Sequence, residues 1–235
     1  MKYTLKTHSK KILADTITPV SVYLRLRDRF PNSLLLESSD YRANDNTFSY
    51  ICCKPIASIT VKDEIITESF PDGKTTTTSI DSTTDVVGII EAFAKKFETE
   101  DNDKKFIQNG LFGYMSYDAV RYFEDIEITK KEGALEVPDF YYAVYQNIIA
   151  INHFNNEAYI FSHTYKEENN LSEIAQLLTV KSFAEYHFKL EGDQQSQMSD
   201  EAYIDLVKTC KKHCQRGDVF QIVPSKRFSQ NFSGD

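Results

Sequence analysis

The chain has 235 residues, enough for one large domain or two small ones. Hydrophobic residues make up 41% of it and aromatic residues 13%, which can fill a sizeable core and exclude a globally disordered chain. The formal net charge of −8, without a long basic run, argues against nucleic acid or an anionic membrane surface as a partner.

The N-terminus begins Met1–Lys6 and lacks the apolar core of a signal peptide. No later stretch is long enough to span a bilayer. We therefore expect a cytoplasmic protein, not a membrane protein, with its cysteines reduced.

Four cysteines occur in two pairs. Cys52 and Cys53 are adjacent in a predicted strand, whereas Cys210 and Cys214 lie at helical spacing, beside His213. Two thiols at that spacing could bind a metal ion, but no second ligand pair with the spacing of a zinc site accompanies them. Core packing is therefore the better interpretation for both pairs.

The first predicted elements are strands within residues 2–14, followed by a helix. Thr18 is suited to the N-cap and Pro19 to the first helical position. Apolar residues then recur every three to four positions as far as Phe30, and Pro31 ends the helix.

The next stretch, Leu34–Ser38, places an acid and a hydroxyl directly after three leucines. Three apolar residues after a turn signal predict a short buried strand, and Glu37 and Ser38 come where that strand leaves the core. A carboxylate accepts from an ammonium group and a hydroxyl can donate or accept, so the pair could hold the charged end of a small amino acid. From these residues alone, a strand end with solvated side chains is the simpler interpretation.

Further strands and a helix follow. Phe48–Cys53 is a predicted buried strand closed by Pro55, and Ile56–Glu68 is predicted to form two strands. A second helix is expected to open at Thr84 or Asp85 because apolar residues of helical periodicity follow.

The stretch Gly110–Glu124 combines a strand with a short helical turn. Gly113 lies inside the strand, where glycine often marks a close approach of another backbone. The two glycines do not make a phosphate loop, since the full glycine fingerprint is absent. Asp118 is predicted to cap the turn, and an ion pair of Arg121 with a nearby carboxylate is interpreted as structural.

A long hairpin, a third helix and a polar stretch come next. Residues 138–161 are dense in aromatic and β-branched residues around an Asn155-Asn156 turn, which predicts the hairpin. Leu171–Leu178 is a predicted helix, and residues 189–198 are polar and unpatterned, as in a linker.

The last stretch starts a new structural unit. Ser199 caps a predicted helix that ends at Gly217, and strand-like residues lie on both sides of Pro224. These elements bury too little surface to stand alone. Either they join the first sheet or the chain is the front part of a longer protein. The whole pattern predicts an α+β fold of large, mainly antiparallel sheets packed together with helices outside.

Three stretches resemble, in order and spacing, the N-terminal part of the large subunit of anthranilate synthase. They are Leu34–Ser38, Gly110–Glu124 and Gly217–Phe228, with a weaker match at Pro138–Tyr141. The resemblance implies a Mg²⁺-dependent lyase that aminates chorismate and eliminates pyruvate to give anthranilate. It also implies a glutamine amidotransferase subunit that supplies ammonia, and feedback inhibition by L-tryptophan.

The resemblance also implies the regulatory residues. Leu36, Glu37, Ser38 and Ser49 are expected to form the tryptophan site, with Glu37 facing the ligand ammonium. The family places a basic or aromatic residue before the strand serine, and Phe48 occupies that position here without a charge.

The implied organisation is a regulatory domain at 1–188, a linker at 189–198 and the beginning of a chorismate-binding domain at 199–235. The family's chorismate-binding and Mg²⁺-binding residues lie further downstream, so no catalytic residue is assigned and the chain alone is expected to be inactive. The near relative aminodeoxychorismate synthase usually has Asn where Val223-Pro224 begins, which favours anthranilate synthase. A stand-alone amino-acid-binding module is the other alternative.

Overall fold

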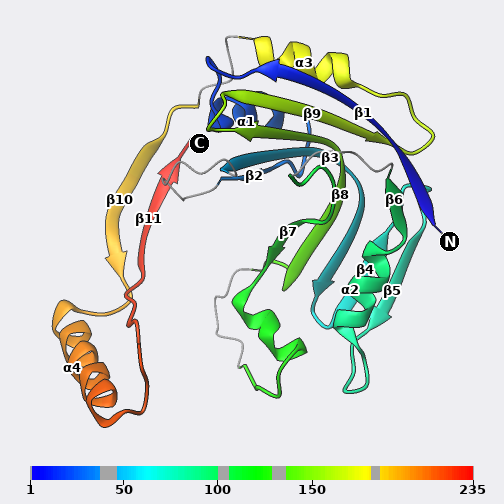
Figure 1. Cartoon of the computed structure of the whole chain (residues 1–235). Helices are drawn as coiled ribbons and strands as arrows, with labels where there is room; N and C mark the ends of the chain where they lie inside the picture. Colours follow the sequence, from blue (N-terminus) through cyan, green and yellow to red (C-terminus); the bar gives the residue numbers. More distant parts are fainter. Residues whose placement is uncertain (1, 38–46, 100–105, 129–135, 181–185, 235) are drawn as a thin grey trace. The chain divides into compact units, whose positions relative to one another are not determined.

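The computed structural model of the chain, shown in Figure 1, describes residues 2–37, 47–99, 106–128, 136–180 and 186–234. The chain divides into two compact units, Met1–Phe183 and Ala184–Asp235, and each is described by itself. Within the described ranges, none of the helices combines the length and apolar character needed to cross a bilayer.

Nine strands form the sheet of the first unit, in the order β5-β4-β3-β8-β9-β1-β6, with β2 beside β3 and β7 beside β8. The strands are β1 (Tyr3–Leu13), β2 (Leu34–Leu36), β3 (Phe48–Lys62), β4 (Ile65–Ser69), β5 (Thr75–Ser79), β6 (Phe97–Thr99), β7 (Phe112–Met115), β8 (Phe140–Asn152) and β9 (Glu157–Thr164). Among these described strands, only β1 and β6 pair in parallel. The predicted α+β class with mainly antiparallel strands is confirmed.

β8 is the central strand of this sheet (Figure 1). It pairs with β3 from Phe140 to Asn152, while its other edge pairs first with β7 and then with β9. Residues 143–152 are all buried. A strand covered on both faces needs an apolar run rather than an alternating pattern, which explains the dense apolar sequence that predicted the β8–β9 hairpin.

A bulge lets β3 continue through a proline. The β3–β8 register shifts between Pro55 and Ala57, and Lys54 has a positive φ of 59°. Proline has no N–H to donate, so a strand tolerates it where a bulge interrupts the ladder. The predicted strand end at Pro55 is therefore wrong, and β3 and β4 are the two strands that cross residues 56–69.

The helices of the first unit begin where their capping residues predict. In α1 (Pro19–Arg27), the Ser21 N–H donates to Thr18 Oγ1 at 3.1 Å. In α2 (Val86–Ala94), the Gly88 N–H donates to Asp85 Oδ1 at 2.8 Å. The third predicted helix is α3 (Leu171–Thr179).

Two core layers cover the two faces of β3, β8 and β9. α1 and α3 pack on one face (Figure 1), through the buried residues Val22, Leu26, Ile51, Cys53, Ile149, Ile160, Ile174 and Leu178. The opposite face carries Cys52, Tyr145, Ile148, Ala150 and Phe161, with the partly buried rings of Phe48, Tyr50, Phe106 and Tyr159. α2 packs in a third cluster, with the C-terminal half of β3 and the first residues of β1 and β8.

The second unit consists of α4 (Asp200–Arg216) and an antiparallel pair, β10 (Lys189–Ser196) and β11 (Phe228–Ser233). The Ala202 N–H donates to Ser199 Oγ at 3.2 Å, and Gly217 ends the helix with a φ of 78°, as its position predicts. Residues 189–196 form a strand where the sequence suggested a linker, because β11 supplies a partner. Residues 218–227, predicted to be strand-like, carry no strand.

Candidate functional site

The candidate site lies where β2 ends, beside the start of β3. The two strands pair antiparallel through Leu34↔Cys52, Leu35↔Ile51 and Leu36↔Tyr50. Leu36 is 37% exposed and Glu37 is exposed, so the chain leaves the core at this point as the sequence predicts. Ser38 lies outside the described residues.

Ser49 is the buried member of this corner. It is fully buried and pairs with Ile151 of β8. The β2–β3 ladder ends at Leu36↔Tyr50, so Glu37 follows directly after the last residue that pairs with β3. The exposed acid and the buried hydroxyl thus flank the last residue pair of the ladder, one on each strand.

His153 completes the corner from the end of β8. Its Nε2 lies 2.7 Å from Ser49 Oγ, and its backbone N–H donates to the Thr47 carbonyl at 3.1 Å. The following turn is fixed by Asn152, whose side-chain Oδ1 accepts from the N–H of Phe154 at 2.8 Å. Sequence reasoning missed this histidine, and its position between a long predicted strand and an asparagine turn was the signal available.

Phe48 does not face this corner. Its ring stacks on Phe106 with centroids 4.7 Å apart, in the core layer opposite the helices. Ser49 is the next residue along β3, and neighbouring side chains of a strand point to opposite faces. The position expected to hold a basic or aromatic residue therefore contributes an aromatic ring to the core here.

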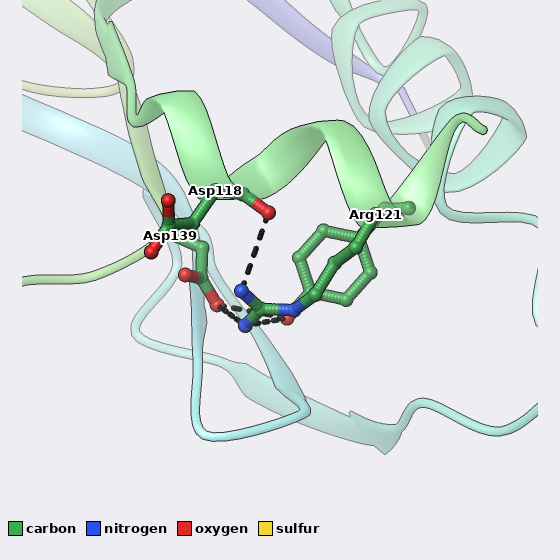
Figure 2. Close-up of polar contacts among 4 residues, drawn as sticks. Asp118, Arg121 and Asp139 are labelled. Atoms are coloured by element: carbon green, nitrogen blue, oxygen red, sulfur yellow. Dashed lines mark hydrogen bonds and ion pairs between the residues drawn. The ribbon is translucent and has the colours of Figure 1, made fainter. Parts of the chain in front are cut away.

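A second polar cluster lies at the other end of β8. In the short 3-10 helix η1 (Tyr117–Tyr122), Arg121 Nη2 lies 2.7 Å from Asp139 Oδ2, and the Tyr122 hydroxyl donates to the same oxygen at 2.8 Å (Figure 2). Arg121 Nη1 also donates to the Asp118 carbonyl at 3.2 Å (Figure 2). Burial, followed by the Asp139 carboxylate, raises the pKa of Tyr122 to about 12.

This cluster fastens η1 to the sheet. The Asp139 N–H donates to Val61 of β3, and the Ser116 N–H donates to the Asp139 carbonyl, both at 2.7 Å. Ser116, rather than the predicted Asp118, occupies the N-cap position. Since every polar group of Asp139 named here holds the local chain, the arrangement supports the structural interpretation of Arg121.

Gly113 explains the close approach of β7 to β8. A Cβ atom at Gly113 would lie 1.9 Å from the Tyr141 carbonyl oxygen, which no side chain could tolerate. The glycine inside the predicted strand therefore allows the backbone of β8 to approach closely, as its position indicated.

The cysteines divide between buried and exposed positions. Cys52 and Cys53 are fully buried, and burial raises the pKa of the Cys53 thiol to about 12. Cys210 is buried within the second unit while Cys214 is exposed. A buried thiol with a raised pKa stays protonated at neutral pH and is a poor nucleophile, which fits core packing for the first pair.

Comparison with known proteins defines the class to which this fold and these motifs belong. The profile of the chorismate binding enzyme family matches residues 17–235. The chain therefore belongs to the chorismate binding enzyme family, which confirms at family level the resemblance found in its motifs.

Within this family, the chain is similar to two kinds of enzyme subunit. The chain is 28% identical over 241 residues to anthranilate synthase component 1 of Lactococcus lactis, covering 95% of this chain and 49% of that protein. It is 26% identical over 234 residues to aminodeoxychorismate synthase component 1 of Bacillus subtilis, covering 95% and 48%. The chain thus spans about half the length of these relatives.

A solved structure supports the fold. The crystal structure of anthranilate synthase component I from Streptococcus pneumoniae TIGR4 matches with a TM-score of 0.58 and 20% identity, covering 96% of this chain and 50% of that one. At this identity the match establishes the α+β fold.

Proposed function

We propose that this chain is the N-terminal part of an anthranilate synthase component I. In this proposal the whole enzyme converts chorismate and ammonia into anthranilate and pyruvate, in tryptophan biosynthesis. A glutamine amidotransferase subunit, component II, supplies the ammonia. The proposal is supported by three ordered motifs in the sequence and by relatives named anthranilate synthase component 1 that align with nearly the whole chain.

The corner between β2 and β3 is the proposed regulatory site for L-tryptophan, formed by Leu36, Glu37, Ser38 and Ser49. One observation supports this assignment: β2 ends at Leu36, opposite Tyr50, so exposed Glu37 follows directly at the edge of the core, beside the strand that carries buried Ser49. A carboxylate at such an edge can bind an ammonium group, and the attraction strengthens as the ligand displaces water. Leu36 is opposite Tyr50 and so projects to the other face of the sheet from Ser49; as the last residue of β2 it is proposed to line the edge of the site.

Catalysis and Mg²⁺ binding are proposed to reside in the half of the enzyme that this chain does not contain. Mg²⁺ requires several oxygen ligands in near-octahedral geometry. Within the described ranges, no three His, Cys, Asp or Glu side chains gather as such a site. The described residues therefore do not fit the ion. We expect the chain alone, a cytoplasmic protein in this proposal, to lack synthase activity.

Two measurements test the proposal. Calorimetry of the 235-residue chain with L-tryptophan should detect saturable binding with a stoichiometry of one. A fusion of this chain to the C-terminal half of the Lactococcus lactis relative should form anthranilate, followed by its fluorescence, from chorismate, Mg²⁺ and ammonia. The isolated C-terminal half is the control. A well-folded fusion that forms no anthranilate would contradict the proposed reaction.

Two alternatives have their own observations. The Bacillus subtilis aminodeoxychorismate synthase relative aligns over the same share of the chain. A second fusion, to the C-terminal half of the Bacillus subtilis relative, separates the two proposals, because the chain should restore activity to the catalytic half of its own enzyme class and not to the other. A stand-alone amino-acid-binding module is suggested by the compact first unit, which holds the candidate corner. Tryptophan binding together with an inactive, folded fusion would favour that module.

A further inference from the structure

β5 (Thr75–Ser79) forms one edge of the nine-stranded sheet, and β4 is its one partner among the described strands (Figure 1). All five residues of β5 are exposed, so its other side is open to a further strand. Bulges, charges and prolines are the usual protection of such an edge. β5 contains no charge and no proline, and its register with β4 shows no bulge.

Two hydrogen bonds at the ends of the β4–β5 hairpin fix which backbone groups of β5 point outward. The Lys74 carbonyl accepts from the Phe70 N–H at 2.9 Å, and the Ile80 N–H donates to the Glu64 carbonyl at 2.7 Å. Along an antiparallel strand, successive residues direct their N–H and C=O groups to one neighbour and then to the other. The even-numbered residues of β5 therefore bond to β4. The odd-numbered residues direct both groups to the open side, and they are Thr75, Thr77 and Ser79.

An edge of this kind is complementary to a second copy of itself. When two β5 strands lie antiparallel with Thr77 opposite Thr77, Thr75 of each copy lies opposite Ser79 of the other. Every outward residue then belongs to a hydrogen-bonded pair, in which the two residues exchange both backbone hydrogen bonds. Any other register leaves an outward residue of β5 without an opposing residue of β5.

The side chains of β5 and its neighbours agree with this pairing. Opposing threonine and serine hydroxyls form favourable cross-strand pairs, and the absence of charge within β5 keeps like charges from facing each other. Lys74 precedes β5 and Asp81 follows it, so antiparallel pairing brings the lysine of one copy to the end that carries the aspartate of the other. Lys74 Nζ lies 3.2 Å from Asp72 Oδ2 and has further donors for a second acid.

We propose that β5 is a dimerisation edge, through which two copies of this chain join their sheets into one continuous antiparallel sheet. The surface lies within the first unit, so the inference does not depend on the proposed tryptophan site or reaction. Main-chain hydrogen bonds supply the attraction, as in other cases of strand addition. Since strands of five residues bury less than a standard interface, we expect a weak dimer with a dissociation constant on the order of 100 μM.

Analytical ultracentrifugation of the 235-residue chain measures the dimer, and Thr77→Pro tests the edge. The Thr77 N–H points away from β4, so proline removes an outward donor without loss of a bond to β4. Both copies lose that donor at the centre of the pair, and dimerisation should weaken at least about tenfold. Thr77→Val keeps the N–H and the β-branched shape, and as the matched control it should retain the dimer.

Cysteine crosslinking tests the register in a chain that carries Cys214→Ser, because Cys214 is the exposed native cysteine. Opposing residues of a hydrogen-bonded pair have Cα atoms about 5.5 Å apart, which a disulfide can bridge. Thr77→Cys should therefore crosslink to its own copy under mild oxidation. Thr76→Cys alone should crosslink much more slowly, because Thr78 of the other copy lies opposite. A mixture of Thr76→Cys and Thr78→Cys should crosslink readily.

Several results would overturn the inference. One is a chain that stays monomeric at about 1 mM, well above the expected dissociation constant. Another is a dimer that Thr77→Pro leaves unchanged, since the copies would then meet elsewhere. If Thr77→Pro does not fold, the crosslinks decide, and equal rates for Thr77→Cys and Thr76→Cys contradict the proposed pairing.

Discussion

β8 starts directly after Asp139 and ends directly before His153, and polar contacts of equal length flank its two ends. At the first end, the Arg121 guanidinium lies 2.7 Å from the Asp139 carboxylate, and their side chains are 19% and 14% exposed. At the second end, Ser49 Oγ lies 2.7 Å from His153 Nε2, and His153 is exposed. The two contacts therefore have the same length but differ in how exposed their side chains are.

The two ends differ in how many polar contacts hold the side chains. The Arg121 guanidinium also donates to Asp118 and Tyr122, and it lies over the Tyr122 ring, 4.8 Å from its centroid. The donors of this guanidinium therefore bond within the local chain, where they support stability. At the other end, the imidazole of exposed His153 makes one side-chain contact, with Ser49. The first end is thus held by several polar contacts and the second by one, and the following experiments test this difference.

The largest effect is expected from closing the space between β7 and the start of β8. Gly113→Val places a Cβ 1.9 Å from the Tyr141 carbonyl oxygen, so the strands must separate. We expect a loss of at least about 3 kcal/mol in the free energy of unfolding, measured by urea titration. Met115→Ala, on the same strand and 41% exposed, should cost less than about 1 kcal/mol. Similar losses for both variants would contradict the steric explanation.

Asp139→Asn tests the start of β8, where Arg121 pairs with Asp139. The amide keeps the shape but removes the charge that pairs with Arg121 and accepts from Tyr122. We expect a loss of about 2 kcal/mol in the free energy of unfolding, because a partly buried guanidinium loses its counterion. Asp118→Asn is the matched control, since Asp118 contributes its backbone carbonyl. An Asp139→Asn variant with an unchanged free energy of unfolding would show that the pair does not stabilise η1.

Glu37→Gln tests the opposite end through ligand binding. L-Tryptophan should bind about tenfold more weakly, because its ammonium loses a charged acceptor. Indole-3-propionate has no ammonium group, so its affinity should not fall. Stability should be unaffected because Glu37 is exposed, and Glu191→Gln in β10 is the control. Calorimetry provides both affinities, and parallel losses for the two ligands would refute the assigned role of Glu37.

His163 gives a smaller, pH-dependent effect and contrasts with exposed His153. It is 1% exposed, and burial holds its pKa below the ordinary value of 6.5. Above pH 6.5 both folded and unfolded chains hold a neutral imidazole and its contribution to stability is complete. As the pH falls through 6.5 the unfolded chain takes up the proton first, so stability is lost toward the lower folded pKa. Urea titrations at pH 7.5 and 5.5 should show this loss, and His163→Gln should reduce it. An unchanged slope in that variant would assign the loss to other groups.

Features set by neighbouring residues were predictable from the sequence. The starts of α1 and α2 follow from Thr18 and Asp85, whose caps act over three residues. The β8–β9 hairpin follows from its apolar run and the Asn155-Asn156 turn. Each of these signals operates within a few residues, so no knowledge of the fold is needed.

Features set by distant partners were not predictable in this way. Pro55 ends a strand in isolation, and only pairing with β8 shows that a bulge accommodates it. β10 has no apolar pattern because all its residues are exposed, and its partner β11 lies beyond α4. Within the site, Glu37 and Ser49 were reached through the resemblance. His153 was missed because its contact with Ser49 spans 104 residues.

The pairing of β1 with β9 has a consequence for synthesis of the protein. Among the strands of the first unit β1 leaves the ribosome first, yet its residues from Lys6 onward pair with β9, and the contact between Thr164 and Lys6 spans 158 residues. A strand that waits for so distant a partner slows folding and leaves an open edge in the nascent chain. Chains released before residue 164 should therefore be the aggregation-prone species. The interior of this sheet closes only when the earliest and latest strands of the first unit meet.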